Sequence, residues 1–368
     1  MKRLVTAVVG LQYGDEGKGR AVAQLVSDDA GGSTIVARAN GGANAGHTVV
    51  ADGERYAFHQ LPVGVFWGLE CVLGAGMVID PVALADEITA WRDQGRNVRV
   101  RVDARAHVVT TRHKELDAKI ENIRSEALGT TRRGNGPAYS DKMLRLGTRI
   151  GDFVSAEHVD EKRAAAAAVL KPLVCDTTTV LLNAFEDGRR VVIEGAHGVG
   201  LDIDHGDYPY VSSSSCTTSG LLASLGLPPQ AVGEVVGVFK PYTTRVGTGP
   251  LVGEFHKLAE RIRKIGHEYG TATGRPRRVG ALDLGQVYRY AMVCGVTSLF
   301  LAKADVVWWD LGTSGLPFRT PDGSWEKLPV HSNMLMETVH EILSPHLEPF
   351  RIGYISHGPE VGQGVRFA

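Results

Sequence analysis

The sequence predicts an α/β protein, with one large domain built on a mostly parallel central sheet flanked by helices. Short apolar runs, often bounded by glycine, recur along the chain and are typical of buried strands. Segments with helical periodicity lie between some of these runs, and strands that alternate with helices indicate an α/β architecture. With 368 residues, the chain is long enough to form one large hydrophobic core.

Eight segments of the chain are predicted to form strands. In chain order they are residues 4–10, 34–37, 71–73, 98–102, 191–193, 235–239, 298–302 and 351–355. Helices are predicted over residues 80–93, 258–265 and 283–294. The first of these begins with Asp80 and Pro81, residue types that favour the start of a helix.

Two segments depart from this alternation. Residues 50–66 contain Asp52-Gly53, a dipeptide typical of hairpin turns, so we expect part of the sheet to be antiparallel. Residues 151–190 include an alanine-rich stretch and are expected to form a helical insert. Because no linker or repeat interrupts the chain, residues 1–368 are expected to form one domain.

Composition excludes several classes of protein. Forty basic and 41 acidic side chains give a net charge of −1, which argues against a general nucleic-acid binder. The four cysteines form no CxxC pair, which favours inert thiols in a reducing compartment. The apolar start of the chain is followed at once by charged residues and resembles a first strand more than a secretory signal. No run approaches the roughly 20 apolar residues of a membrane span, so we expect a cytoplasmic protein.

The strongest local signal is the glycine-rich segment 14–19, which follows the first predicted strand. Backbone N–H groups of such a loop can surround phosphate oxygens, and Lys18 adds a positive charge. The segment is like a P-loop, although Gly19 stands where a hydroxyl would bind magnesium. Asp15 and Glu16 would repel a phosphate unless a metal or a proton-transfer role compensates them. A glycine-rich turn without a ligand is the alternative.

A second glycine-rich loop covers residues 40–48 and ends in His47-Thr48. A single histidine is more often a packed or surface residue than a catalyst. The small residues around His47 change this balance, because they allow a ligand to approach the backbone closely.

Both loops belong to a longer series of motifs that resembles the adenylosuccinate synthetase family. The matching segments are residues 10–19, 44–48, 129–131, 133–139, 194–196, 201–206, 208–211, 244–247, 273–278, 303–305 and 358–359. They cover most of the chain in order, and together they are very specific.

The resemblance implies a purine nucleotide ligase that joins L-aspartate to carbon 6 of a 6-oxopurine nucleotide. In the first step the γ-phosphoryl group of a nucleoside triphosphate moves to the 6-oxygen, and in the second the aspartate amine displaces the phosphate. Asp15 matches the general base that takes the proton from ring nitrogen 1, and His47 matches the general acid at the 6-oxygen. The carboxylate of Asp15 and the carbonyl of Gly46 match ligands of Mg²⁺.

The same resemblance assigns binding residues for three substrates. Those expected to bind the donor, GTP or ATP, are Gly14, Glu16, Gly17, Lys18, Gly19, Lys303, Asp305, Ser356 and Gly358. Those expected to bind the acceptor nucleotide are Asn44, Thr131, Arg145, His197, Ser212, Val246 and Arg275. Those expected to bind L-aspartate are Thr273, Arg275 and Arg277. In the family the arginine that matches Arg145 comes from the neighbouring subunit, which implies a homodimer with shared sites.

Several departures from the family pattern leave alternatives open. His197 stands where the family usually has glutamine, Ala272 replaces a threonine, and Ser212 replaces a threonine while keeping the hydroxyl. The chain is also short, as in phage relatives that use dGMP, L-aspartate and ATP to make a 2-aminoadenine precursor. IMP is the favoured acceptor and dGMP the alternative. A non-catalytic GTP-binding module and an inactive paralogue are further alternatives; they are disfavoured because the aspartate-binding motif is present and Asp15, Lys18 and His47 are intact.

Overall fold

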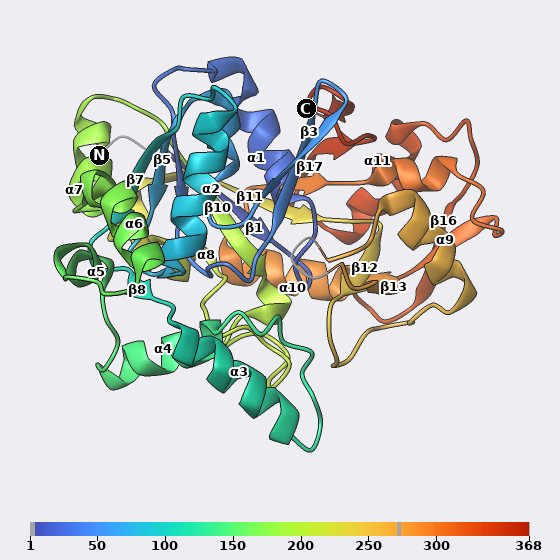
Figure 1. Cartoon of the computed structure of the whole chain (residues 1–368). Coiled ribbons are helices and arrows are strands. Elements are labelled where there is room, and N and C mark those ends of the chain that lie inside the picture. Colours follow the sequence, from blue (N-terminus) through green and yellow to red (C-terminus); the bar gives the residue numbers. More distant parts are fainter. Residues whose placement is uncertain (1–3, 271–273, 368) are drawn as a thin grey trace.

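The protein is described by a computed structural model that covers residues 4–270 and 274–367. A ten-stranded sheet runs through its centre (Figure 1). From one edge to the other its strands are β18 (Gly364–Arg366), β17 (Ile352–Ser356), β14 (Ser298–Leu301), β11 (Val232–Phe239), β1 (Val5–Gly10), β10 (Val191–Gly198), β2 (Ile35–Arg38), β5 (Glu70–Leu73), β7 (Arg99–Asp103) and β9 (Val174–Cys175). Neighbouring strands are parallel except for β17 and β18, so the predicted mostly parallel α/β fold is confirmed.

Apolar side chains cover both faces of this sheet. Val5, Ala7 and Val9 of β1 belong to one hydrophobic cluster, whereas Val8 belongs to the other. This alternation follows from the two-residue period of a strand. A strand buried on both faces carries apolar residues on both of them, which explains why β1, apart from the buried Thr6, was recognisable as an apolar run.

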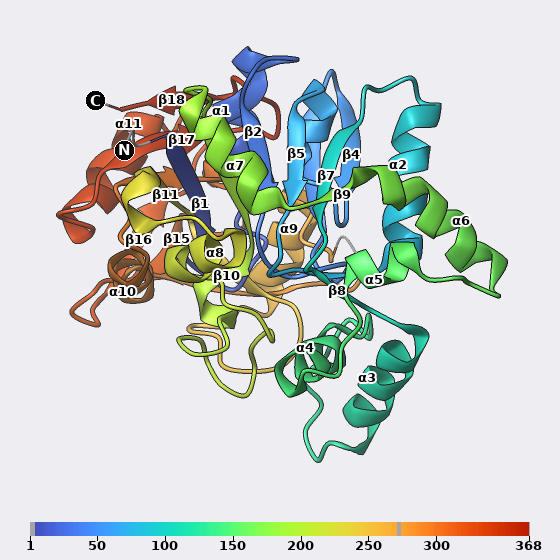
Figure 2. The same ribbon diagram turned by 90° about the vertical axis from the view of Figure 1, so that its left-hand side faces the viewer.

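Helices pack against the sheet and extend beyond it (Figures 1 and 2). They are α1 (Lys18–Val26), α2 (Pro81–Asp93), α3 (Thr111–Ile123), α4 (Asn135–Leu144), α5 (Ile150–Ser155), α6 (Glu161–Leu170), α7 (Thr177–Glu186), α8 (Thr218–Leu225), α9 (Lys257–Gly266), α10 (Leu284–Cys294) and α11 (Met336–Leu343). The predicted helices α2, α9 and α10 are present. Asp80 caps α2 by accepting from the N–H of Ala83 at 3.2 Å, and Asp283 caps α10 in the same way. Among the described residues, no helix is long and apolar enough to cross a membrane.

The predicted hairpin is present, but it lies outside the central sheet. Strands β3 (His47–Ala51) and β4 (Glu54–Phe58) pair antiparallel as a separate two-stranded sheet. Asp52 and Gly53 both have positive φ, 55° and 79°, as a tight two-residue hairpin turn requires. The expectation that this hairpin would supply the antiparallel part of the main sheet was therefore wrong; the C-terminal strand β18 supplies it.

The segment expected as a helical insert is helical for the most part. Helices α5, α6 and α7 occupy it, but between α6 and α7 the two-residue strand β9 joins the edge of the central sheet beside β7. The segment is therefore continuous with the sheet.

A second sheet was not predicted. It contains β12 (Tyr242–Arg245), β13 (Arg278–Asp283), β15 (Gly315–Arg319) and β16 (Trp325–Pro329), and it lies beside the main sheet on the same side as α9 (Figure 1). β15 and β16 do not form the continuous apolar runs that mark buried strands in the sequence, so they were not predicted as strands. Another small pair joins β6 (Val78–Ile79) and β8 (His107–Val108) near α4.

This topology places several loops at one end of the sheet. The loops after β1, β2, β10, β11, β14 and β17 all leave the carboxyl ends of parallel strands. Ligands of open α/β sheets bind at this edge, where loops from neighbouring strands converge.

Candidate active site

These loops surround a cavity of about 960 Å³. Most of the predicted site residues line it, although they come from positions 14 to 358 of the chain. They are Gly14, Asp15, Gly17, Lys18, Gly19, Asn44, Gly46, His47, Thr131, His197, Ser212, Val246, Arg277, Lys303, Asp305, Ser356 and Gly358. A cavity of this size with converging polar groups is typical of a small-molecule site.

Glu16 holds the phosphate loop, residues 14–19, through hydrogen bonds within the loop. Its fully buried carboxylate accepts from the N–H of Gly14 at 2.8 Å and from Lys18 Nζ at 2.6 Å. The side chain packs so tightly under Gly10 and Gly198 that a Cβ at either glycine would collide with it. Glu16 was expected to bind the donor, but its side chain is turned into the loop and lies outside the cavity wall. A carboxylate in that position shapes the loop and avoids facing a phosphate, which it would repel.

His47 is oriented by an acid that the sequence analysis did not assign to the site. Glu194, in the middle of β10, pairs with His47 Nδ1 and accepts from the N–H of Val63 at 2.9 Å. Burial alone would raise the pKa of Glu194, but His47, Arg38 and this N–H hold it below its usual range. Burial also lowers the pKa of His47, against the opposing effect of Glu194. A neutral imidazole that donates from Nδ1 to an ionised carboxylate leaves Nε2 available for a ligand.

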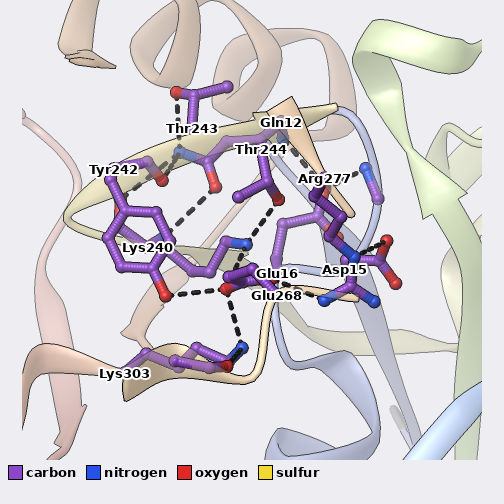
Figure 3. A network of polar contacts seen from close by, with 12 residues as sticks. Gln12, Asp15, Glu16, Lys240, Tyr242, Thr243, Thr244, Glu268, Arg277 and Lys303 are labelled. Atoms are coloured by element: carbon purple, nitrogen blue, oxygen red, sulfur yellow. Dashed lines mark hydrogen bonds and ion pairs between the residues drawn. The ribbon is translucent and has the colours of Figure 1, made fainter. Parts of the chain in front are cut away.

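Asp15 lies at the start of the phosphate loop in a left-handed conformation, with φ of 58°. Its carboxylate pairs with Arg277 Nε at 2.8 Å, and the same guanidinium pairs with Glu268 at 2.5 Å through Nη1 (Figure 3). Arg277 was expected to bind L-aspartate. Here it lines the cavity while paired with two protein carboxylates, so a substrate carboxylate would have to compete for it.

His197 and Asn44 face each other in the cavity wall. Asn44 Oδ1 accepts from Asn135 Nδ2 at 2.8 Å and from the N–H of Gly42, so its Nδ2 is the group that faces His197 Nε2 at 3.4 Å. Burial, together with the charges of Lys18 and Arg38, lowers the pKa of His197 to about 3. The imidazole is therefore neutral and carries its proton on Nδ1, which finds no partner among the described residues.

Three predicted site residues are not found in the described cavity wall, and one of them, Arg275, is placed differently from expectation. Arg275 donates to the carbonyl of Gly129 at 2.7 Å and to that of Thr130. These bonds hold the loop around Thr131, and Arg275 itself is not part of the cavity wall. Arg145 ends α4 in a left-handed conformation and is exposed at the surface, away from the cavity of its own chain. Thr273, and the nearby departure Ala272, lie outside the described residues.

The expected donor-base residues Lys303 and Asp305 also line the cavity. Lys303 Nζ donates to the carbonyl of Gly266 and to Glu268, both at 2.7 Å. Burial raises the pKa of Asp305, and Lys303 opposes this shift. Trp309 also lines the cavity, whereas Trp308 is fixed by donating to the carbonyl of Met334 at 2.6 Å.

Comparison with known proteins agrees with this geometry. The family model described as adenylosuccinate synthetase matches residues 7–168 and 161–310. The chain belongs to the adenylosuccinate synthetase family. An adenylosuccinate synthetase of Geobacillus sp. (strain WCH70) is 43% identical over 334 residues, 82% of this chain and 77% of the relative. That of Symbiobacterium thermophilum is 40% identical over 87% of this chain and 82% of the relative.

Two solved structures are also similar. The fully ligated adenylosuccinate synthetase from Plasmodium falciparum superimposes with a TM-score of 0.88 at 29% identity, covering 99% of this chain and all of the other. The succinoaminodeoxyadenylate synthetase of cyanophage S-2L, bound to dGMP and dATP, gives a TM-score of 0.76 at 26% identity over 100% and 96% of the two chains. The expected family is therefore confirmed, and the protein is a ligase that forms a C–N bond.

Proposed function

We propose that this ligase condenses L-aspartate with carbon 6 of IMP to give adenylosuccinate, using a nucleoside triphosphate through a 6-phosphoryl intermediate. The observation that carries the proposal is the convergence of Asp15, Lys18 and His47 on one cavity, with His47 oriented by Glu194. An acid and a base in the lining of one cavity, beside a phosphate loop, are what the two-step reaction needs.

Asp15 acts as the base in this proposal. An oxopurine has a proton on ring nitrogen 1, and removing it places negative charge on the 6-oxygen, which then attacks the γ-phosphoryl group. Asp15 is suited to this role because it lies in the cavity and its side chain is 27% exposed, so substrate can reach it. Arg277 must first exchange its contact with Asp15 for the carboxylates of L-aspartate.

His47 faces the transferring phosphoryl group and the 6-oxygen. Glu194 fixes the proton on Nδ1, so a second proton on Nε2 makes the imidazole a cation that can donate. An anionic phosphoryl group beside Nε2 favours that cation and opposes the effect of burial. Lys18 and the N–H groups of Gly17 and Gly19 surround the phosphates.

Mg²⁺ fits the oxygen atoms present. Among the described residues there is no cluster of three or more histidine, cysteine or acidic side chains that could hold a metal. Mg²⁺ usually needs no such cluster, because it binds through one or two protein oxygens together with substrate phosphates and water. Asp15 and the carbonyl of Gly46, both in the cavity wall, would hold it. When bound, the ion neutralises charge on the phosphates.

Acceptor and donor identity are part of the proposal. Similarity at 43% identity to adenylosuccinate synthetases favours IMP. The similarity to the cyanophage enzyme, bound to dGMP and dATP, supports dGMP with an adenine nucleotide as the second candidate. Guanine is the proposed donor base, since Asp305 in the cavity can accept from its two adjacent N–H donors.

We also propose a homodimer of single-domain subunits with shared active sites. Arg145 is exposed beside Met143, Leu144 and Leu146, whose side chains are 60–74% exposed. An apolar surface around a predicted site residue suits a subunit interface. The four cysteines are free, which fits the proposed cytoplasmic location.

The deciding experiment measures kcat/KM for IMP and for dGMP, each with L-aspartate and the better donor. We expect IMP to win. If dGMP wins by more than about tenfold, a difference near 1.4 kcal/mol in the transition state, the product is the 2-amino compound. If neither acceptor gives phosphate release that depends on L-aspartate, the ligase assignment to this site is wrong.

A further inference from the structure

A buried carboxylate joins two parts of the cavity that bind different substrates in the proposed function. Glu268 is fully buried, and its Oε1 accepts from Lys303 Nζ and Tyr242 OH at 2.7 Å and from Lys240 Nζ at 3.1 Å. Its Oε2 accepts from Arg277 Nη1 at 2.5 Å. Figure 3 shows Glu268 at the centre of this network.

The charges in the network fix Glu268 as an anion. Burial alone would raise its pKa, but Lys240, Lys303 and Arg277 hold that pKa well below the usual range. Burial likewise lowers the pKa of Lys240 to about 8, and Glu268 opposes this effect. Both oxygens of Glu268 already accept hydrogen bonds from protein donors, so we do not expect this carboxylate to bind substrate itself.

The backbone reinforces the link to Arg277. The N–H of Arg277 donates to the carbonyl of Glu268 at 3.0 Å, and Tyr269 and Pro276 form a β-bridge next to this contact. Glu268 therefore holds Arg277 by main chain and by side chain. Lys303, which follows β14, is held at the same point through the carbonyl of Gly266 and the carboxylate of Glu268.

We propose that Glu268 is a positioning residue that sets the places of Arg277 and Lys303 together, and so fixes the L-aspartate site and the donor-base site relative to each other. This inference rests on the proposed roles of Arg277 and Lys303. Two cations that share one rigid anion cannot be displaced independently, so a change at Glu268 alters the affinity of both ligands.

The test is Glu268→Gln. The amide keeps the shape but removes the charge, and its NH₂ group must face either Arg277 or the lysines, all of which are donors. We expect KM for L-aspartate and KM for GTP to rise together by about tenfold or more, while KM for IMP changes less than about threefold. Equilibrium titrations of GTP and of L-aspartate give the same comparison without turnover.

Glu70→Gln is the matched control. Glu70 is also a buried acid that pairs with three cations, Arg99, Arg101 and Arg189, but it lies in β5, outside the cavity wall. The Glu70→Gln variant should leave KM for L-aspartate and KM for GTP unchanged, even if its melting temperature falls. Glu268→Asp keeps the charge on a shorter side chain and should raise both constants by a smaller factor.

The outcomes separate the possibilities. If Glu268→Gln lowers the melting temperature but leaves both affinities unchanged, Glu268 is structural and the inference is wrong. A loss of affinity for only one of the two ligands also overturns the inference. If Glu268→Gln does not fold, Glu268→Asp is judged by the same two criteria. If the unaltered protein makes no product but the two titrations still shift together, the positioning role stands and the proposed reaction fails.

Discussion

Replacing Glu194 by glutamine should slow the reaction strongly while preserving the fold of the cavity. Glu194 is fully buried, pairs with His47 Nδ1 and accepts from the N–H of Val63 at 2.9 Å. Glutamine has nearly the same shape, so the contact with Val63 can survive. It removes the negative charge that stabilises the imidazolium, and its amide can turn an N–H toward Nδ1, which selects the wrong tautomer.

The expected magnitude follows from the role of His47. Misplacing or removing a general acid typically costs about 100- to 10,000-fold in rate, which corresponds to roughly 3–5 kcal/mol in the barrier. We expect kcat of Glu194→Gln to fall by at least about 100-fold, with KM values for the nucleotides changed far less. His47→Asn should cause a similar loss, and the double variant should be no worse than either single variant, because both remove one function.

The pH profile gives a second readout. Glu194 raises the pKa of His47 relative to burial alone. A general acid works while it is protonated, so activity is lost as pH rises through its pKa. Removing Glu194 lowers that pKa, so the alkaline limb of the kcat profile should move to lower pH.

Glu70→Gln again provides the control, since Glu70 is a buried acid outside the cavity wall. Melting temperatures of both variants should be measured, because Glu194→Gln removes one of the two acids, Glu194 and Glu87, that stabilise the charge of buried Arg38. Near-normal kcat for folded Glu194→Gln, or an unshifted pH profile, would refute the reasoning.

Three further predictions follow from the site. Asp15→Asn should lower turnover by about 100- to 10,000-fold in a folded protein, and near-normal turnover would remove Asp15 as the base. Mixing an Arg145→Leu variant with an Asp15→Asn variant should restore activity, because one site per heterodimer is then intact; no rescue despite proven subunit exchange would contradict a shared site. GTP should be a better donor than ATP at equal concentration, and Asp305→Ala should reduce this preference; equal or better use of ATP would contradict guanine recognition.

The strands were predictable where they are buried on both faces. β1 and the later part of β11 consist mostly of apolar residues that belong to two hydrophobic clusters, so burial left an apolar run in the sequence. The second sheet escaped prediction because β16 has exposed residues at Trp325, Glu326 and Lys327. Its strand conformation comes from pairing with β15, which local composition does not reveal.

The chemistry of the site was predictable where it depends on a local motif. The glycines around Lys18 and the small residues before His47 act through backbone conformation and close approach, which neighbouring residues in the sequence decide. The orientation of Glu16 was not predictable from its neighbours in the sequence. Its carboxylate packs against Gly198 at the end of β10, which is distant in the chain.

The sequence by itself therefore determined the family and the α/β class, and it supplied the proposed acid, base and phosphate loop, since each is written in short contiguous segments. Tertiary structure alone decided the pairs that tune those groups: Glu194 with His47, Arg277 with Asp15, and Glu268 with Lys303. These partners come from distant segments, and the strength of each pair depends on burial. Distance and burial are set when loops from different strands meet at one edge of the sheet.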